Sequence, residues 1–244
     1  MKIDKRRKYY LVLDTETTNS LEDPLVYDLG YAIIDKHGTI YKTESFIVSD
    51  IFFQDDLMAS AYYIKKLSLY YKDIKVGSRK VVSLYEARQQ LKEDMTTYSV
   101  QAVLAYNMAF DYLSTNTTER YTTKSKYRYF IPYGVPIWCI WNMACNTICN
   151  SKKYVEWCLL NGEVSQKGNI KTSAETVYKY LTDNPQFTES HTALEDVLIE
   201  TAIFVECLKR KGITLIEKKI NRACWQIPQR TRKKLTAFNE LGMS

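Results

Sequence analysis

Apolar runs separated by turn residues mark the start of the chain. Residues 9–13, 29–35 and 40–48 are rich in β-branched and aromatic side chains, which favours β-strands. Residues 36–39 (Lys-His-Gly-Thr) lie between the second and third runs and are typical of a turn. The pattern therefore predicts that the chain opens with strands in an antiparallel meander.

Apolar positions at helical spacing dominate three later segments. Residues 83–98, 172–181 and 192–211 are predicted to be helices, and Gly212 is a typical terminator for the last one. Each segment begins with a Ser/Thr-x-x-Glu pattern that can form a capping box. The three pairs are Ser83 and Glu86, Thr172 and Glu175, and Thr192 and Glu195.

The segments between these elements are less regular. Residues 102–105 (AVLA) predict a short buried strand, and residues 107–113 predict a helix or a tight turn. Residues 51–71 are expected to be helical in part, and residues 137–148 have helical character. Residues 116–133 are polar and tyrosine-rich and lead into a Pro-Tyr-Gly-Val-Pro sequence, which predicts a loop or a mobile arm.

The composition is that of an ordinary globular protein. Of the 244 residues, 45% are hydrophobic and 25% are charged, which fits one domain, or one domain with an appendage. No stretch approaches the roughly 20 apolar residues needed to cross a bilayer, so no membrane partner is expected. The net charge of +6 indicates only that an anionic partner would be tolerated. Most of the 20 tyrosines are expected to fill the core rather than stack on bases.

The six cysteines bear on the compartment. They form no C-x-x-C pair, their spacing matches no zinc site, and the chain has only two histidines. The basic start, residues 1–8, is not followed by the apolar run of a secretory signal. The sequence therefore predicts a reduced intracellular protein, located in the cytoplasm.

The segment after Gly212 has a different character. Between Glu217 and Lys234 it carries seven basic residues and one acidic residue, with Trp225 among them. A solvated surface segment and a phosphate-contacting arm are both compatible with this pattern. We therefore expect a domain at residues 1–212 and a basic tail at residues 213–244.

Two carboxylates follow the first predicted strand directly. Asp14 and Glu16 are two residues apart, so in a strand they point to the same side. Such pairs are common on protein surfaces, but crowded carboxylates at the end of an apolar strand repel one another unless a cation joins them. A hard divalent cation with oxygen ligands meets that requirement.

Two further acidic groups come later in the chain. Asp111 follows the predicted strand at 102–105, although helix capping by Asn107 with a surface aspartate explains this pattern equally well. Asp196 lies in the first turn of the last helix. His191 comes just before the cap of that helix, on more mobile backbone. A rigid ligand beside a mobile proton carrier is suited to metal-assisted hydrolysis.

These motifs, taken in order, resemble the three exonuclease motifs of the DnaQ-like superfamily. The order is Asp-x-Glu at Asp14, Asn-x-x-Phe-Asp at Asn107, and His-x-x-x-x-Asp at His191. The histidine is typical of the DEDDh branch. Residues 13–18 (LDTETT), 28–32 (DLGYA) and 191–197 (HTALEDV) resemble the surrounding family sequences, and the resemblance covers about residues 8–211. The chain departs from the family at Asn19, where glycine is common, and at residues 137–144 (IWCIWNMA).

The resemblance implies a fold, cofactors and roles for the motif residues. The fold would be α/β and RNase H-like, with a mixed five-stranded sheet flanked by helices. Two divalent cations, Mg²⁺ or Mn²⁺, would be held by the four carboxylates, with Asp14 bridging them and Glu16 and Asp196 completing one site. Asp111 would hold the second ion and His191 would accept a proton from water. Thr15, Thr17, Asn107 and Phe110 would bind the terminal nucleotide.

The function expected on this basis is metal-dependent 3′→5′ exonuclease activity. The partner would be a nucleic acid with a free 3′ end, with single-stranded DNA preferred and nucleoside monophosphates released. An exonuclease for RNA or short oligonucleotides, a metal-dependent endonuclease and a non-catalytic nucleic-acid-binding module are the alternatives. A polymerase partner and a homodimer both stay open.

Overall fold

The computed structural model describes residues 3–126 and 128–211. The chain divides into two compact units. Unit 1 contains the described residues up to Cys139 together with Glu189–Thr201, and unit 2 contains Ile140–Thr188 together with the described residues from Ala202 onward. The basic tail expected at residues 213–244 lies outside the described residues. No helix of the described part is long and apolar enough to cross a membrane.

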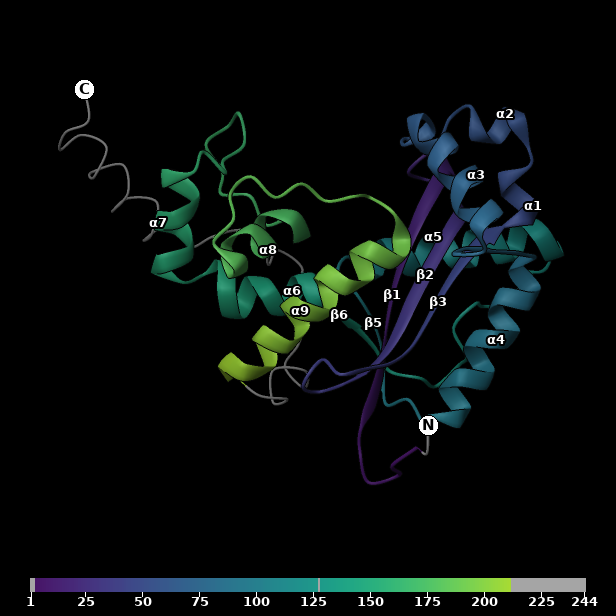
Figure 1. Ribbon diagram of the computed structural model, residues 1–244, viewed down its shortest axis with the longest axis horizontal. Helices are drawn as coiled ribbons and strands as arrows, with labels where there is room; N and C mark the ends of the chain where they lie inside the picture. The colour runs from purple at the N-terminus through teal and green to yellow at the C-terminus, as the bar shows by residue number, and fades with distance from the viewer. Residues whose placement is uncertain (1–2, 127, 212–244) are drawn as a thin grey trace. The chain divides into compact units, whose positions relative to one another are not determined.

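Unit 1 is built around a mixed sheet of six strands, drawn from purple to teal in Figure 1. The strands are β1 (Tyr9–Asn19), β2 (Pro24–Asp35), β3 (Ile40–Val48), β4 (Lys80–Val82), β5 (Val103–Ala105) and β6 (Ile137–Cys139), in the order β4-β3-β2-β1-β5-β6. The pairs β1–β2 and β2–β3 are antiparallel, which confirms the opening meander. The pairs β3–β4, β1–β5 and β5–β6 are parallel.

The sixth strand corrects the expectation for residues 137–148. Ile137–Cys139 pairs in parallel with Val103–Ala105, so the segment begins as a strand and becomes helical only from Ile140. A three-residue apolar strand shows too little periodicity to be told from the first turn of a helix. The same brevity applies to β4, and the five-stranded sheet implied by the resemblance is therefore a six-stranded one.

Six helices of unit 1 connect these strands. They are α1 (Ser49–Phe52), α2 (Asp55–Met58), the 3₁₀ helix η1 (Ile64–Lys66), α3 (Leu67–Val76), α4 (Leu84–Thr97) and α5 (Met108–Thr123). The partly helical character of residues 51–71 is confirmed. The capping box of α4 is also confirmed, because Ser83 and Glu86 each bond to the backbone of the other.

The length of α5 corrects the loop expected at residues 116–133, because the first eight of these residues are helical. The threonines that disfavour a helix by propensity are accommodated by bonds to the preceding turn. Thr115 and Thr118 donate their hydroxyls to the carbonyl oxygens of Asp111 and Ser114, both at 2.7 Å. Such bonds satisfy buried hydroxyl groups without a partner outside the helix.

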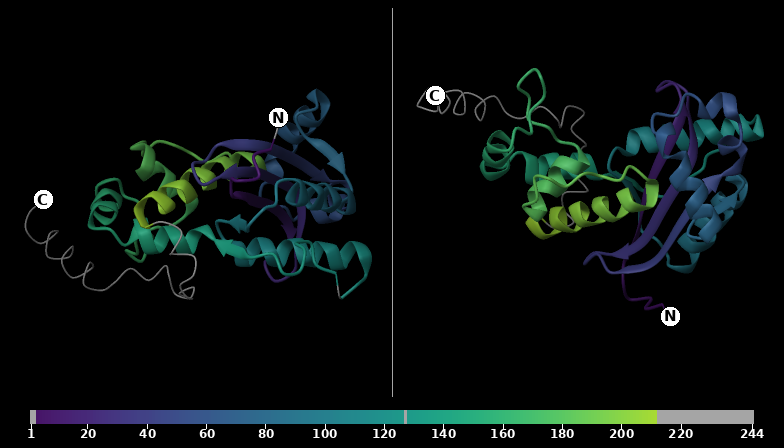
Figure 2. Two further views of the ribbon diagram at one scale, coloured as in Figure 1. Left: turned by 90° about the horizontal axis from the view of Figure 1, so that it is seen from below. Right: turned by 45° about the horizontal axis from the view of Figure 1, so that its top comes forward.

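The two faces of the sheet have different neighbours. Tyr9, Leu11 and Leu13 of β1 point into the hydrophobic core of unit 1, where they meet residues of α4 such as Leu91. Because side chains alternate along a strand, Asp14 and Glu16 belong to the opposite face. There the first turns of α9 (Ala193–Lys211), which belong to unit 1 as far as Thr201, lie against β2. The views in Figure 2 show this helix start beside the strands.

Unit 2 is helical. It contains α6 (Ile140–Ala144), the π-helical turn η2 (Cys145–Cys149), α7 (Lys152–Leu160), α8 (Ala174–Thr182) and the described part of α9 from Ala202. The helix predicted at 172–181 is present, but its cap is Ser173, whose side chain accepts from the Thr176 backbone. Thr172 instead accepts a hydrogen bond from the Trp141 indole at 2.9 Å, so its predicted capping box is wrong.

The expectation that most tyrosines fill the core holds only for a part of them, since six of the described tyrosines, such as Tyr62 and Tyr133, are exposed. Six tyrosines are among the largest fully buried side chains of the described residues: Tyr9, Tyr10, Tyr27, Tyr31, Tyr70 and Tyr154. The five cysteines of the described part form no disulfide. Cys224 lies outside it.

Candidate active site

The first two site residues come from the end of β1. Asp14 pairs with Gly30 of β2 and Glu16 pairs with Asp28, and the register shifts after Glu16 at a β-bulge. Both side chains therefore leave the same face of the sheet, as the two-residue spacing predicts. One carboxylate oxygen each from Asp14, Glu16 and Asp196 lie within 4.8 Å of one another.

Asp196 reaches this position because the start of α9 is fixed against β2. The backbone N–H of Ala193 donates to the Asp28 carboxylate at 3.1 Å. At Gly30 the strand approaches the helix so closely that an added Cβ would lie 2.5 Å from the backbone nitrogen of Leu194. The Asp196 N–H bonds to the Thr192 carbonyl at 3.0 Å, which places Asp196 in the first turn.

A buried ion pair supports this helix start. Asp28 is fully buried, and Nη1 of Arg79 donates to both of its carboxylate oxygens at 3.0 Å. Nη2 of Arg79 donates to Glu195 at 3.1 Å, and the Thr192 hydroxyl also bonds to Glu195. One guanidinium thus joins β2 to the first turn of α9. A planar fork of donors suits arginine to this bridging role.

Asp111 approaches the site from α5. Because β1 and β5 are parallel, their carboxyl ends meet at the same edge of the sheet, and α5 begins just after β5. The Thr15 hydroxyl donates to Oδ1 of Asp111 at 2.9 Å, and only 3% of Asp111 is exposed. The charge of Asp111 helps raise the pKa of Asp14, so the two carboxylates are electrostatic neighbours.

Glu200 is a fifth carboxylate that the sequence motifs did not identify. It lies one helical turn after Asp196 on α9, is 3% exposed, and accepts the Tyr106 backbone N–H at 3.1 Å. After desolvation, the Glu200 charge is the largest cause of the raised pKa of Asp14. The i, i+4 spacing from Asp196 is the signal that could have indicated it, since such residues share one helix face.

Burial and mutual repulsion raise the pKa values of the carboxylates in this site. Burial, followed by the negative charge of Asp196, raises the pKa of Glu16 to about 9. Burial and the charge of Glu189 raise the pKa of Asp196 to about 8, against the opposing effect of Lys66. Burial raises the pKa of Asp111 to about 7, and it raises the pKa values of Asp14 and Glu200 well above their ordinary values.

These residues fit a divalent cation. Oδ1 of Asp196 is buried, and within the described part of the chain it has no hydrogen-bond partner. An unpaired buried carboxylate oxygen is costly, and an ion held between carboxylates would remove both this cost and the mutual repulsion. Carboxylates without cysteine or histidine ligands favour Mg²⁺ or Mn²⁺ over softer metals.

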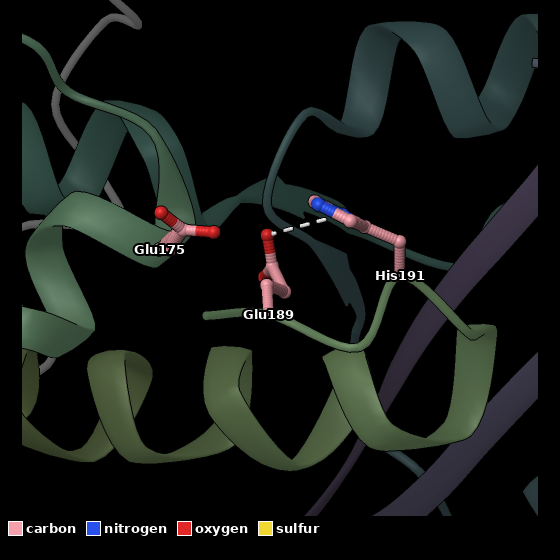
Figure 3. A group of neighbouring side chains, drawn as sticks. All are labelled: Glu175, Glu189 and His191. Carbon is pink, nitrogen blue, oxygen red and sulfur yellow. Dashed lines mark ion pairs between the residues drawn. The ribbon is translucent and has the colours of Figure 1, made fainter. Parts of the chain in front are cut away.

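His191 lies on the loop that leads into α9. Its backbone has a φ of +50°, in the left-handed region, and its side chain is about one-third exposed. The ring is stacked on Tyr63, with 4.7 Å between centroids and 12° between planes. Nδ1 of His191 lies 3.6 Å from a carboxylate oxygen of Glu189, the contact drawn as a dashed line in Figure 3.

The four expected nucleotide contacts differ in exposure. The Thr15 side chain is buried and orients Asp111, so only its backbone remains for a nucleotide. Thr17 and Phe110 are half-buried. Asn107 is exposed at the N-cap of α5, and its side chain makes no capping bond, which corrects the capping interpretation.

The fold resembles that of solved exonuclease structures. The zinc-bound E. coli exonuclease I complex with single-stranded DNA matches 84% of this chain with a TM-score of 0.52 and 15% identity. E. coli exonuclease I with a dA16 oligonucleotide matches 86% (TM-score 0.50, 14% identity). Exonuclease I from Methylocaldum szegediense matches 95% (TM-score 0.52, 16% identity). No family model and no curated protein sequence matches the chain.

The chain spans less than half of these structures, with 41%, 42% and 46% of their lengths covered. At such low identity the similarity establishes the fold alone. That fold is the expected RNase H-like one, a mixed sheet flanked by helices.

Proposed function

We propose that the protein is a metal-dependent 3′→5′ exonuclease that hydrolyses phosphodiester bonds at nucleic-acid ends and releases nucleoside monophosphates. The observation that carries this proposal is the convergence of Asp14, Glu16 and Asp196 within 4.8 Å, next to an unpaired oxygen of Asp196. Asp14 and Glu16 come from the start of the described chain and Asp196 comes from near its end. Their mutual repulsion is unfavourable unless a bound cation neutralises it. We assign residues 1–212 to this activity.

Each motif residue has a role in the proposal. Asp14 would be shared by two cations, with Glu16 and Asp196 completing one site and Asp111 holding the other. When bound, two divalent cations would neutralise charge on the attacking and leaving oxygens of an in-line displacement. His191 is partly exposed and would accept the proton of the attacking water, a contribution of about 10²–10⁴-fold to the rate.

Single-stranded DNA is the substrate we favour. The support is that the solved exonuclease I structures with this fold include complexes with single-stranded DNA. The alternative outcomes of the test are hydrolysis of RNA, cleavage of circular DNA by an endonuclease, and nucleic-acid binding without hydrolysis. A polymerase partner or a homodimer is compatible with the proposal, and neither is required for it.

The test is a time course on matched 5′-labelled DNA and RNA oligonucleotides and on circular single-stranded DNA. Mg²⁺ or Mn²⁺ should produce a ladder shortened from the 3′ end and free nucleoside monophosphates, and EDTA should abolish both. Circular DNA should stay intact. The matched variants are Asp196→Asn, expected to be inactive and folded, and Asp56→Asn, an exposed carboxylate on α2 that should leave the rate unchanged. Turnover near wild type in Asp111→Asn would contradict the metal assignment.

A further inference from the structure

The backbone at His191 needs support from its surroundings. A φ of +50° is unfavourable for a residue with a Cβ, because the side chain approaches the following carbonyl. Such a conformation persists where neighbouring groups hold it in place, and it recurs at functional sites. The contacts around this loop therefore identify what fixes the direction of the imidazole.

Two residues of a short segment, Tyr63 and Lys66, contact this loop in addition to the Glu189 carboxylate. Tyr63 is the N-cap residue of η1, and its ring lies parallel to the imidazole of His191. Lys66 ends η1, and its ammonium donates to the backbone carbonyl of His191 at 3.1 Å and to that of Ser190. The same ammonium lies 4.3 Å from the centroid of the Tyr63 ring, a cation–π arrangement.

We propose that Tyr63 and Lys66 are positioning residues that clamp the His191 loop, with Lys66 holding the backbone and Tyr63 holding the ring. The inference rests on the proposed role of His191 as proton acceptor. The clamp joins a segment that follows α2 in the sequence to the loop before α9. Lys66 would fix the position of the His191 backbone, and Tyr63 would fix the plane of the imidazole, relative to Asp196 five residues further on.

The chemistry of Lys66 distinguishes a clamp from a solvated surface lysine. Its ammonium donates to the consecutive carbonyls of Ser190 and His191 and lies over the Tyr63 ring, so it is held in one place rather than solvated. It also stands close enough to Glu16 and Asp196 to lower their pKa values against the effect of burial. The lysine therefore connects the loop conformation to the carboxylates.

Removing the clamp should not unfold the protein. Tyr63 and Lys66 are both half-buried, and neither belongs to the hydrophobic core cluster of the described residues. Surface substitutions away from the core usually change stability little. A loss of activity in these variants can therefore be separated from a loss of fold by measuring both.

The experiment compares kcat and KM for Mg²⁺-dependent hydrolysis of a single-stranded DNA oligonucleotide. Tyr63→Leu and Lys66→Met should each lower kcat by about tenfold, a part of what a positioned base contributes, and leave KM within about twofold. Tyr63→Phe should restore kcat because it keeps the ring, and Lys66→Arg should restore it in part. The matched controls are Lys65→Met and Tyr85→Leu, both exposed, which should behave as wild type.

A double-mutant cycle decides between positioning and general destabilisation. In a His191→Ala background, Tyr63→Leu should cause no further loss, because the ring it positions is absent. Lys66→Met should cause a smaller loss there than in the wild-type background, because only its electrostatic effect on Glu16 and Asp196 remains. Equal losses with and without His191, or full kcat in both single variants, would overturn the clamp while leaving the exonuclease proposal intact. Full kcat in His191→Ala would instead contradict the proposed base, and the clamp with it.

Discussion

At Gly30, β2 lies in close contact with the first turn of α9, next to the strand that carries Asp14 and Glu16. A Cβ at this position would lie 2.5 Å from the Leu194 nitrogen, 2.6 Å from the Ala193 carbonyl carbon and 2.7 Å from the Leu194 Cα. All three are backbone atoms, so no side-chain rotation can make room. Ordinary contact begins at 3.4 Å, and Gly30→Ala must therefore increase the separation between β2 and the first turn of α9 by nearly 1 Å.

The displacement should affect stability and activity differently. Forcing an extra methyl into a packed contact costs about 1–3 kcal/mol of unfolding free energy. Asp196 follows Leu194 by two residues, so the same movement carries a carboxylate away from Asp14 and Glu16. A misplacement of about 1 Å in a catalytic array can lower the rate about 10²-fold. We expect a loss of turnover well beyond what partial unfolding explains.

Urea denaturation and single-turnover hydrolysis measure the two effects. Ile33→Val is the matched control, because Ile33 lies on the same strand but points into the hydrophobic core. It should cost about 0.5–1.5 kcal/mol and leave turnover unchanged. Wild-type stability together with wild-type turnover in Gly30→Ala would refute the argument that this contact sets the position of Asp196.

Two further predictions concern the charges of the site. The raised pKa values of Asp111, Asp196 and Glu16 (about 7, 8 and 9) mean that the metal-free folded state keeps protons that the unfolded chain has released. Its unfolding free energy should therefore fall as the pH rises from about 4 to 9, and added Mg²⁺ should offset the fall. A melting temperature that depends on neither pH nor Mg²⁺ would contradict this prediction. Glu200→Gln keeps an acceptor for the Tyr106 N–H but removes a carboxylate next to Asp14 that would ionise when a cation binds, so Mg²⁺ affinity measured by calorimetry should drop about tenfold. Unchanged affinity in Glu200→Gln would remove Glu200 from the site.

The sequence predicts those helices and strands that are determined by residues close together in the chain. The β1–β3 meander follows from apolar runs separated by a turn, and the start of α4 follows from the pairing of Ser83 with Glu86. The length of α5 was not predictable in this way, because its threonines are poor helix formers until their hydroxyls bond to carbonyls one turn earlier. β6 is too short to carry a period of its own.

The site residues differ in the same way, because local motifs indicate some of them and only long-range contacts reveal the others. The spacing of Asp14 and Glu16 predicts one direction for both carboxylates, and the pattern at Thr192 places Asp196 in a first turn. Glu200 has no motif and gains its place only when β5 and α9 are brought together through Tyr106. Tyr63 and Lys66 are equally inaccessible to sequence reasoning, since the His191 ring and backbone that they contact lie more than one hundred positions away.

The hydrogen bond from Ala193 to Asp28 spans 165 positions of the chain. All six strands of unit 1 precede the segment that makes this bond. Residues Ile140–Thr188 of unit 2 lie in the sequence between the last strand and that segment. A nascent polypeptide released at Thr188 would carry the whole sheet but neither His191 nor Asp196. Truncated products of this kind should therefore lack the proposed hydrolytic activity, which would require synthesis to pass the start of α9.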